Sequence, residues 1–252
     1  MITAKNTVSD LLSLYRSIDL TGEAREYLHI QAGRCISTCD WMATTLGIKK
    51  ARILDVGCGS ILTNSVLLAA AGADVTALDM AKGLCSNPAK QIAERMGISL
   101  LPCNALESLS ELTEKPPNSF DVVLFAEVIE HITFNPVEMW TRLCRVLRPG
   151  GRIVVTTPNY HALSAARTGQ FFRDVKNMIL GRSSGLRIER LLEYRTYSHH
   201  WKEYSAKDIR TYFSSLSPDL CIQNLLGLSC NVKPGGAVCY SISNASRLFP
   251  TT

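Results

Sequence analysis

The sequence predicts an α/β fold in which helices cover both faces of a parallel β-sheet. Its 252 residues are 46% hydrophobic and 19% charged, which is enough apolar material for one α/β domain with a well-buried core. Short apolar runs alternate with helix-length segments through the middle of the chain. This alternation is typical of βαβ units, whose right-handed crossovers place helices on both faces of the sheet.

Five apolar runs have the length and composition of buried strands. They lie at residues 51–56, 74–78, 98–102, 120–125 and 152–156. Between them we expect helices at 62–71, 81–96, 105–112 and 136–147. The turn Arg148-Pro149-Gly150-Gly151 ends the last of these helices and begins the fifth strand.

The two ends of the chain complete the prediction. Apolar markers predict helices before the first strand, within residues 1–48. Ser205 followed by Asp208 resembles a capping box, and it predicts a helix that runs through Phe213. Two final strands are expected at 220–226 and 237–242.

Composition excludes several classes of protein. No apolar run approaches the ~20 residues of a membrane span, and no basic stretch with a following apolar region marks a secretory signal. The nine cysteines are scattered singly without a CxxC pair, which argues against a disulfide framework or a zinc knuckle and favours a cytoplasmic location. A net charge of +5 is too weak to argue for nucleic acid by itself.

The strongest local signal is a strand that runs into a glycine turn, Ile53 to Gly59, with Asp79 at the tip of the next strand. Glycine allows backbone to approach a ligand closely, and an acid after the second strand can accept hydrogen bonds from both hydroxyls of a ribose. We therefore expect a cofactor that contains a nucleoside.

Two such cofactors compete, NAD and S-adenosylmethionine. The third glycine of the dinucleotide fingerprint is missing after Gly57-Cys58-Gly59. Asp55 stands just before the loop, where its carboxylate would repel a pyrophosphate but suit the cationic amino group of a methionine. These features favour S-adenosylmethionine.

The span 53–159 resembles the class I S-adenosylmethionine-dependent methyltransferases. The motifs are DVGCGS (55–60), VTALDM (75–80), FDVVLFAEVIEH (120–131) and LRPGGRIVVTTPN (147–159). Within that superfamily the chain is similar to the ubiquinone-biosynthesis O-methyltransferase type and its small-molecule relatives. The resemblance implies a doubly wound, Rossmann-like sheet of seven strands, mostly parallel, with the last strand antiparallel.

The resemblance also implies roles for individual residues. The methionine part of the cofactor would be held by Asp55, Gly57, Cys58 and Gly59, with its carboxylate on Arg34, its ribose on Asp79, and its adenine against Met80 and beside Asn104 and Ala105. Many relatives have Gly where this chain has Ile61, and Asp where it has Asn104. An amide side chain can still hydrogen-bond adenine.

A second cluster follows the fourth strand, where Glu127, Glu130 and His131 stand three and four residues apart. That spacing would place all three on one face of a helical turn at the carboxyl end of the sheet, where open α/β folds bind ligands. They could bind a divalent cation such as magnesium, or supply a general base. The resemblance implies a candidate metal site, because the same Glu-x-x-Glu-His pattern coordinates a divalent metal in some ubiquinone O-methyltransferases. It does so too in small-RNA 2′-O-methyltransferases, where a further histidine completes the site; His200 is the candidate here. Glu127, His131 and His200 are thus the candidate catalytic residues.

We expect one domain, 1–252, in four parts. These are an N-terminal helical cap (1–48), a cofactor-binding core (49–159), a helical lid insertion (160–198) and a C-terminal helix with the last strands (199–252). Phe171 and Phe172, with interleaved arginines, could close over an acceptor or make peripheral membrane contact.

The leading functional hypothesis is methyl transfer to a hydroxyl of a small-molecule biosynthetic intermediate. A ribose 2′-O-methyltransferase acting on RNA shares the Glu-Glu-His-His arrangement, but the modest basic excess makes a nucleic-acid partner the weaker alternative. A cofactor-binding partner protein without catalysis is a third, motivated by Ile61 and Asn104. The sequence leaves the acceptor and the oligomeric state open.

Overall fold

The computed structural model describes residues 8–16, 18–158, 204–216, 220–227 and 237–244. The expected lid insertion at 160–198 and the candidate ligand His200 lie outside these residues, so they remain predictions. The division of the chain into four parts of one domain likewise remains a prediction.

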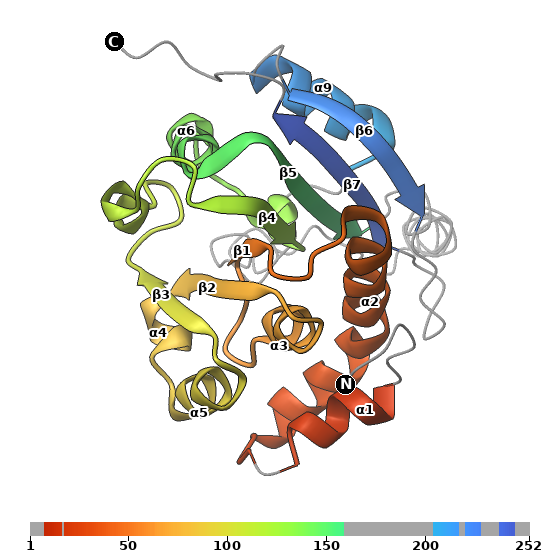
Figure 1. Ribbon diagram of the computed structural model, residues 1–252, viewed down its shortest axis with the longest axis vertical. Coiled ribbons are helices and arrows are strands. Elements are labelled where there is room, and N and C mark those ends of the chain that lie inside the picture. Colours follow the sequence, from red (N-terminus) through yellow and green to blue (C-terminus); the bar gives the residue numbers. More distant parts are fainter. Residues whose placement is uncertain (1–7, 17, 159–203, 217–219, 228–236, 245–252) are drawn as a thin grey trace, which may run out of the picture.

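The core is a seven-stranded sheet with the strand order β3-β2-β1-β4-β5-β7-β6 (Figure 1). Its first five strands in space are parallel: β3 (Ser99–Cys103), β2 (Asp74–Met80), β1 (Arg52–Val56), β4 (Phe120–Ala126) and β5 (Leu147–Pro158). β7 (Ala237–Asn244) is antiparallel to both β5 and β6 (Leu220–Gly227). The predicted α/β class with a parallel core is confirmed.

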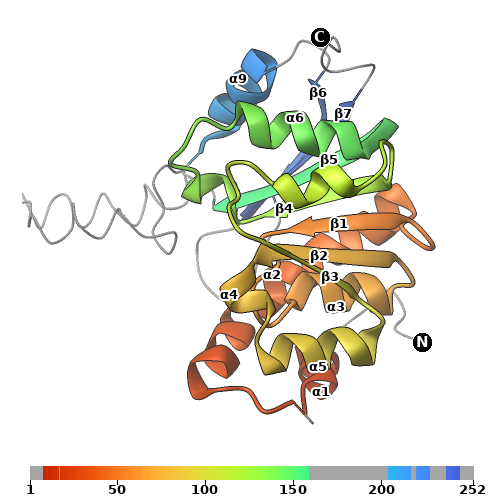
Figure 2. The same ribbon diagram turned by 90° about the vertical axis from the view of Figure 1, so that its left-hand side faces the viewer.

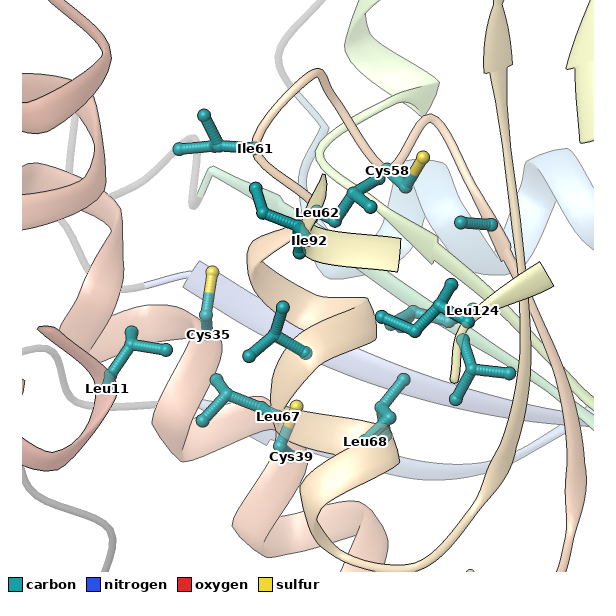
Figure 3. Packing of buried hydrophobic residues seen from close by; sticks show 14 of the residues in the cluster. Leu11, Cys35, Cys39, Cys58, Ile61, Leu62, Leu67, Leu68, Ile92 and Leu124 are labelled. Carbon is teal, nitrogen blue, oxygen red and sulfur yellow. The ribbon is translucent and has the colours of Figure 1, made fainter. Parts of the chain in front are cut away.

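Helices on one face come mostly from the N-terminal half of the chain (Figure 2). They are α1 (Val8–Leu14), α2 (Gly22–Leu46), α3 (Thr63–Ala70) and α5 (Asn87–Met96). Their apolar side chains share one buried cluster with Ile53, Val122, Leu124 and Val154 of the central strands (Figure 3). Alternate residues of the same strands point to the other face, as the two-residue period of a strand requires.

The second face is covered by α6 (Val137–Val146) and α9 (Ala206–Leu216), together with the short 3-10 helix η1 (Ser110–Glu114). Trp140 of α6 is the largest fully buried side chain, and its ring packs against Phe125 of β4 and Phe213 of α9. The predicted capping box of α9 is confirmed, because Asp208 N–H donates to Ser205 Oγ and Ser205 N–H donates to Asp208 Oδ2.

Two predicted helices were wrong in detail. The expected helix 81–96 is two helices, α4 (Ala81–Leu84) and α5, because Ser86 caps a new helix by accepting a hydrogen bond from Ala89 N–H. The expected helix 105–112 is replaced by η1, which begins after Leu109 in a left-handed conformation. A left-handed residue interrupts α-helical hydrogen bonding, so a regular helix cannot continue through this position.

No helix within the described ranges combines the length and the apolar composition needed to cross a membrane. The thiols of Cys35, Cys39, Cys58, Cys85, Cys103 and Cys144 are free.

Candidate active site

The glycine loop connects the end of β1 to α3 at the carboxyl edge of the sheet. Gly57 and Gly59 both have positive φ angles, 73° and 69°, which glycine adopts without strain. Gly57 N–H donates to the carbonyl of Leu78 in β2, at 2.8 Å. A Cβ atom at Gly57 would collide with the side chain of Val128, whereas one at Gly59 would meet nothing within 4 Å. Gly57 therefore allows close packing, and Gly59 leaves open space beside the loop.

Asp79, at the tip of β2, holds the glycine loop in place. Its Oδ2 accepts a hydrogen bond from Gly59 N–H at 2.7 Å, and its Oδ1 accepts one from Met80 N–H at 2.6 Å. Burial raises the pKa of Asp79, while the two backbone donors oppose that shift. Each carboxylate oxygen keeps a second lone pair, so the group can still accept hydrogen bonds from ligand hydroxyls.

A cavity of about 520 Å³ opens between this loop and α2. The loop residues Gly57 to Ile61 form one wall, and the ends of β4 and β5 contribute Glu127 and Thr156. Tyr27, Gln31, Arg34 and Thr38, which stand about one turn apart along one side of α2, form the opposite wall.

Asp55 lies beneath the loop and does not line this cavity. Its side chain is 1% exposed, and Ser65 Oγ of α3 donates to Oδ2 at 2.6 Å. Burial raises the pKa of Asp55 to about 7. The carboxyl group joins the end of β1 to α3 behind the loop, and its Oδ1 is buried without a hydrogen-bond partner among the described residues. The expected contact with the amino group of the cofactor remains a prediction.

Arg34 of α2 forms an ion pair with Glu127 across the cavity wall, with 2.5 Å between Nη1 and Oε2. Glu127 Oε1 accepts a hydrogen bond from the Thr156 hydroxyl at 3.0 Å. Each oxygen of the Glu127 carboxylate thus has a partner, Arg34 on α2 or Thr156 in β5. Arg34 was expected to bind the carboxylate of the cofactor; in this structure its partner is Glu127.

The backbone of Glu127 has a φ of 57°, a left-handed conformation that is costly for a residue with a side chain. Its N–H donates to the Thr156 carbonyl at 2.9 Å, which stabilises the turn at the end of β4. This turn directs the carboxylate towards Arg34 and the cavity. A strained residue held by several neighbours at a cavity wall is typical of functional sites.

Glu130 lies behind Glu127 and is fully buried. The Thr157 hydroxyl donates to Glu130 Oε2 at 3.1 Å, and a hydrogen bond joins the two carboxyl groups. The pKa of Glu130 is raised to about 8, mainly by burial and to a smaller extent by the negative charge of Glu127. At neutral pH Glu130 is therefore mostly protonated and can donate its proton to Glu127.

The expected helical turn after β4 is a short 3-10 turn, Ile129–His131. It brings Glu127 and Glu130 together, whereas His131 is not among the residues that line the cavity. Within the described ranges, no group of three or more His, Cys, Asp and Glu side chains is placed to hold a metal ion. These contacts give no support to magnesium, and the four-ligand site with His200 remains a prediction.

The residues expected near adenine lie at the carboxyl ends of β2 and β3, outside the cavity. Met80 ends β2 and is half-buried, and Ala105 follows β3. The Asn104 side-chain amide donates to Glu111 Oε1 at 3.1 Å, and Asn104 N–H donates to the same oxygen. The Asn104 carbonyl oxygen and the second N–H of its amide are left for a ligand.

Sequence reasoning missed the polar residues that support the cavity. Thr156 and Thr157 hold the two glutamates, and Tyr27 and Gln31 of α2 face the loop. The two threonines had a signal, since they form a polar pair at the carboxyl end of an otherwise apolar strand. The α2 residues had none, because only the fold shows which face of that helix meets the loop.

Comparison with known proteins identifies this region. Residues 54–155 match the family model described as a methyltransferase domain. A ubiquinone biosynthesis O-methyltransferase of Dechloromonas aromatica is 30% identical over 123 residues, which are 48% of this chain and 50% of that protein. One from Xanthomonas oryzae pv. oryzae is 34% identical over 122 residues, 48% of each chain. The chain thus matches about half the length of these relatives.

Several solved structures share the fold of this chain. The 1,6-didemethyltoxoflavin-N1-methyltransferase of Burkholderia thailandensis, bound to 1,6-didemethyltoxoflavin and S-adenosylhomocysteine, aligns with a TM-score of 0.60 and 16% identity, over 95% of this chain and 87% of that one. Magnesium protoporphyrin IX methyltransferase of Synechocystis PCC 6803, bound to S-adenosylhomocysteine, aligns with a TM-score of 0.56 and 15% identity, over 92% of each chain. At these identities the likeness is one of fold alone.

Proposed function

We propose that the protein transfers a methyl group from S-adenosylmethionine to a hydroxyl of a small molecule, with residues 54–155, which match the methyltransferase-domain model, as the catalytic region. The methyl donor is supported by the family match together with the loop geometry. The hydroxyl acceptor is supported by the similarity to O-methyltransferases and by the carboxylate at the cavity wall.

One observation carries the proposal: a glycine loop fixed to Asp79, at the carboxyl ends of β1 and β2, beside a cavity of about 520 Å³. The loop fits the cofactor because its backbone at Gly59 faces open space that a side chain would fill. Asp79 lies within hydrogen-bond distance of that backbone and keeps lone pairs for the ribose hydroxyls.

When bound, S-adenosylmethionine supplies an activated methyl group on a sulfonium, so the protein's task is to align the acceptor and exclude water. The acceptor oxygen forms a bond to the methyl carbon as the carbon–sulfur bond breaks, and the sulfur keeps the electron pair. S-adenosylhomocysteine and the methylated acceptor are the products. The hydroxyl proton must leave to a base.

Glu127 is the base that the contacts favour. It lines the cavity, and its burial raises the pKa of this carboxyl while Arg34 opposes the shift. A raised pKa makes a carboxylate a stronger proton acceptor. Thr156 and Arg34 fix its orientation, so that a hydroxyl entering from the side of Tyr27 would meet a positioned oxygen.

A methyl-transfer screen tests this proposal. The protein is incubated with S-adenosylmethionine carrying a labelled methyl group, together with catechols, glycosides or short RNAs as acceptors. We expect label on a small hydroxyl compound, and at least a tenfold smaller kcat for Glu127→Gln with nearly unchanged affinity for S-adenosylhomocysteine, since general bases contribute about 10²–10⁴-fold.

Each other outcome is informative. Label on RNA alone would contradict the small-molecule acceptor. Cofactor binding without transfer to any acceptor would favour a binding protein without catalysis. Full activity of Glu127→Gln would leave a methyltransferase that works by alignment alone.

A further inference from the structure

The turn that follows the glycine loop has an unusual backbone. Leu62 stands at the N-cap position of α3 with a φ of 52°, and no side chain caps this helix end. The left-handed conformation costs a leucine free energy that a glycine would not pay. Ile61, the residue before it, is buried and 5% exposed. Something outside the turn must stabilise this conformation.

The stabilising contact comes from the N-terminal end of the chain. The Tyr15 hydroxyl, just after α1, donates a buried hydrogen bond to the Ile61 carbonyl, with 2.7 Å between the two oxygens. A side-chain hydrogen bond also joins Tyr15 to Thr63, the first residue of α3. Burial raises the pKa of Tyr15, so the hydroxyl keeps its proton and remains a donor.

Tyr15 therefore contacts both sides of Leu62, on Ile61 and on Thr63. Ile61 and Thr63 line the cavity, whereas Tyr15 does not. The ring of Tyr15 belongs to the same buried cluster as Leu11, Ile61, Leu62 and Ile92. Figure 3 shows these four neighbours. The ring thus packs in the core while the hydroxyl acts on the turn.

We propose that Tyr15 is a positioning residue that holds the turn from Ile61 to Thr63 in the conformation that receives the cofactor. The inference rests on the proposed function, because it takes the cavity beside the glycine loop as the cofactor site. The segment just after α1 thereby supports the cofactor site without lining the cavity.

The physical reason is a shift in population. Without the hydroxyl, the Ile61 carbonyl loses its buried partner, and the left-handed Leu62 loses the contacts on its two sides. The free protein then populates other conformations of the turn, and its apparent affinity falls in proportion to the fraction that remains competent. Bound cofactor would restore the turn, so turnover at saturating cofactor would change little.

The test compares Tyr15→Phe with a matched control, Tyr212→Phe. Tyr212 is also a mostly buried tyrosine whose hydroxyl has a buried partner, Trp140 Nε1–H at 2.8 Å, but it lies on α9, on the other face of the sheet. For Tyr15→Phe we expect S-adenosylhomocysteine to bind about tenfold more weakly by calorimetry, the loss of one buried hydrogen bond. For Tyr212→Phe we expect a similar loss of Tm and unchanged affinity.

Hydrogen exchange gives a second measurement that does not depend on activity. Amides of residues 57–66 should exchange faster in free Tyr15→Phe than in the free wild-type protein, and saturating S-adenosylhomocysteine should restore their protection. Faster exchange throughout the sheet would instead mark a purely structural role and would contradict the inference.

The two proposals fail separately. If the wild-type protein does not bind S-adenosylhomocysteine, the proposed function fails. If the wild-type protein binds it and Tyr15→Phe binds it equally well, or if Tyr212→Phe loses as much affinity, only the role of Tyr15 is overturned.

Discussion

Arg34 of α2 and Glu127 at the end of β4 form an ion pair across the wall of the candidate active site, with 2.5 Å between Arg34 Nη1 and Glu127 Oε2. Their side chains are 20% and 14% exposed, so the pair is largely screened from water. The contact joins α2 to the carboxyl edge of the sheet, between residues that are 93 positions apart in the chain. It fixes the carboxylate that we propose as the base.

Breaking this pair from one side should destabilise the protein more than removing both charges. We expect Arg34→Leu to lower the free energy of unfolding by about 2 kcal/mol, because Glu127 is then left mostly buried without its cation. The double variant Arg34→Leu with Glu127→Gln should recover part of that loss in urea denaturation. Equal stability of the single and the double variant would contradict this expectation, because it would show that the unpaired carboxylate of Glu127 carries no cost.

The two loop glycines should differ in a predictable way. Gly57→Ala and Gly59→Ala both place alanine at a positive φ, which costs each about 1 kcal/mol. Only Gly57→Ala also forces a Cβ against Val128, which should add about 1–3 kcal/mol of overpacking. In thermal denaturation, the Tm of Gly57→Ala should therefore be lower than that of Gly59→Ala. Adding Val128→Ala to each variant should reduce the difference between their Tm values. An unchanged difference would contradict a collision between the added Cβ and Val128.

Asp55 should make the free protein less stable as pH rises. Its pKa is raised to about 7 in the folded state, whereas the unfolded chain has the ordinary value near 4. Between these values the folded state binds the extra proton, so stability falls with rising pH and levels off above about pH 7. Relative to Asp55→Asn, the wild-type protein should lose about 2–4 kcal/mol from pH 4 to pH 8. If the free energies of unfolding of the two proteins changed with pH in the same way, the raised pKa of Asp55 would be contradicted.

Chelation tests the alternative use of the glutamate cluster. A divalent cation on Glu127 would compete with Arg34 and Thr156, each of which already contacts one of its two oxygens. We therefore expect methyl transfer to proceed at an unchanged rate after treatment with a chelator. Loss of activity that magnesium restores would show that the Arg34–Glu127 pair opens and that the predicted metal site with His200 forms.

The features that the sequence predicted well depend on neighbouring residues. The glycine loop follows directly from β1, and Asp79 ends the next strand, so both features could be recognised from the local pattern. The hydrogen bond that joins Gly59 to Asp79 was not predicted. The capping box of α9 lies within four residues and was likewise readable. The strands were found because each is a short apolar run with its own turn signals.

The features that it predicted poorly depend on distant residues or on backbone conformation. Nothing near Arg34 shows that Glu127 will be its partner, and nothing near Tyr15 shows that it will reach Ile61. The burial of Asp55 behind the loop depends on where α3 packs. The left-handed Leu109 replaced an expected helix, since a leucine gives no sign that it will adopt that conformation.

The central claim is that the loop fixed by Asp79 binds S-adenosylmethionine. Calorimetric titration of S-adenosylhomocysteine into the wild-type protein and into Asp79→Ala tests it most directly. We expect one binding site in the wild-type protein and a loss of about 1.5–3 kcal/mol of binding free energy in the variant, because charge-assisted hydrogen bonds to the ribose are removed. Equal affinity of the two proteins, or no binding by the wild-type protein, would contradict it.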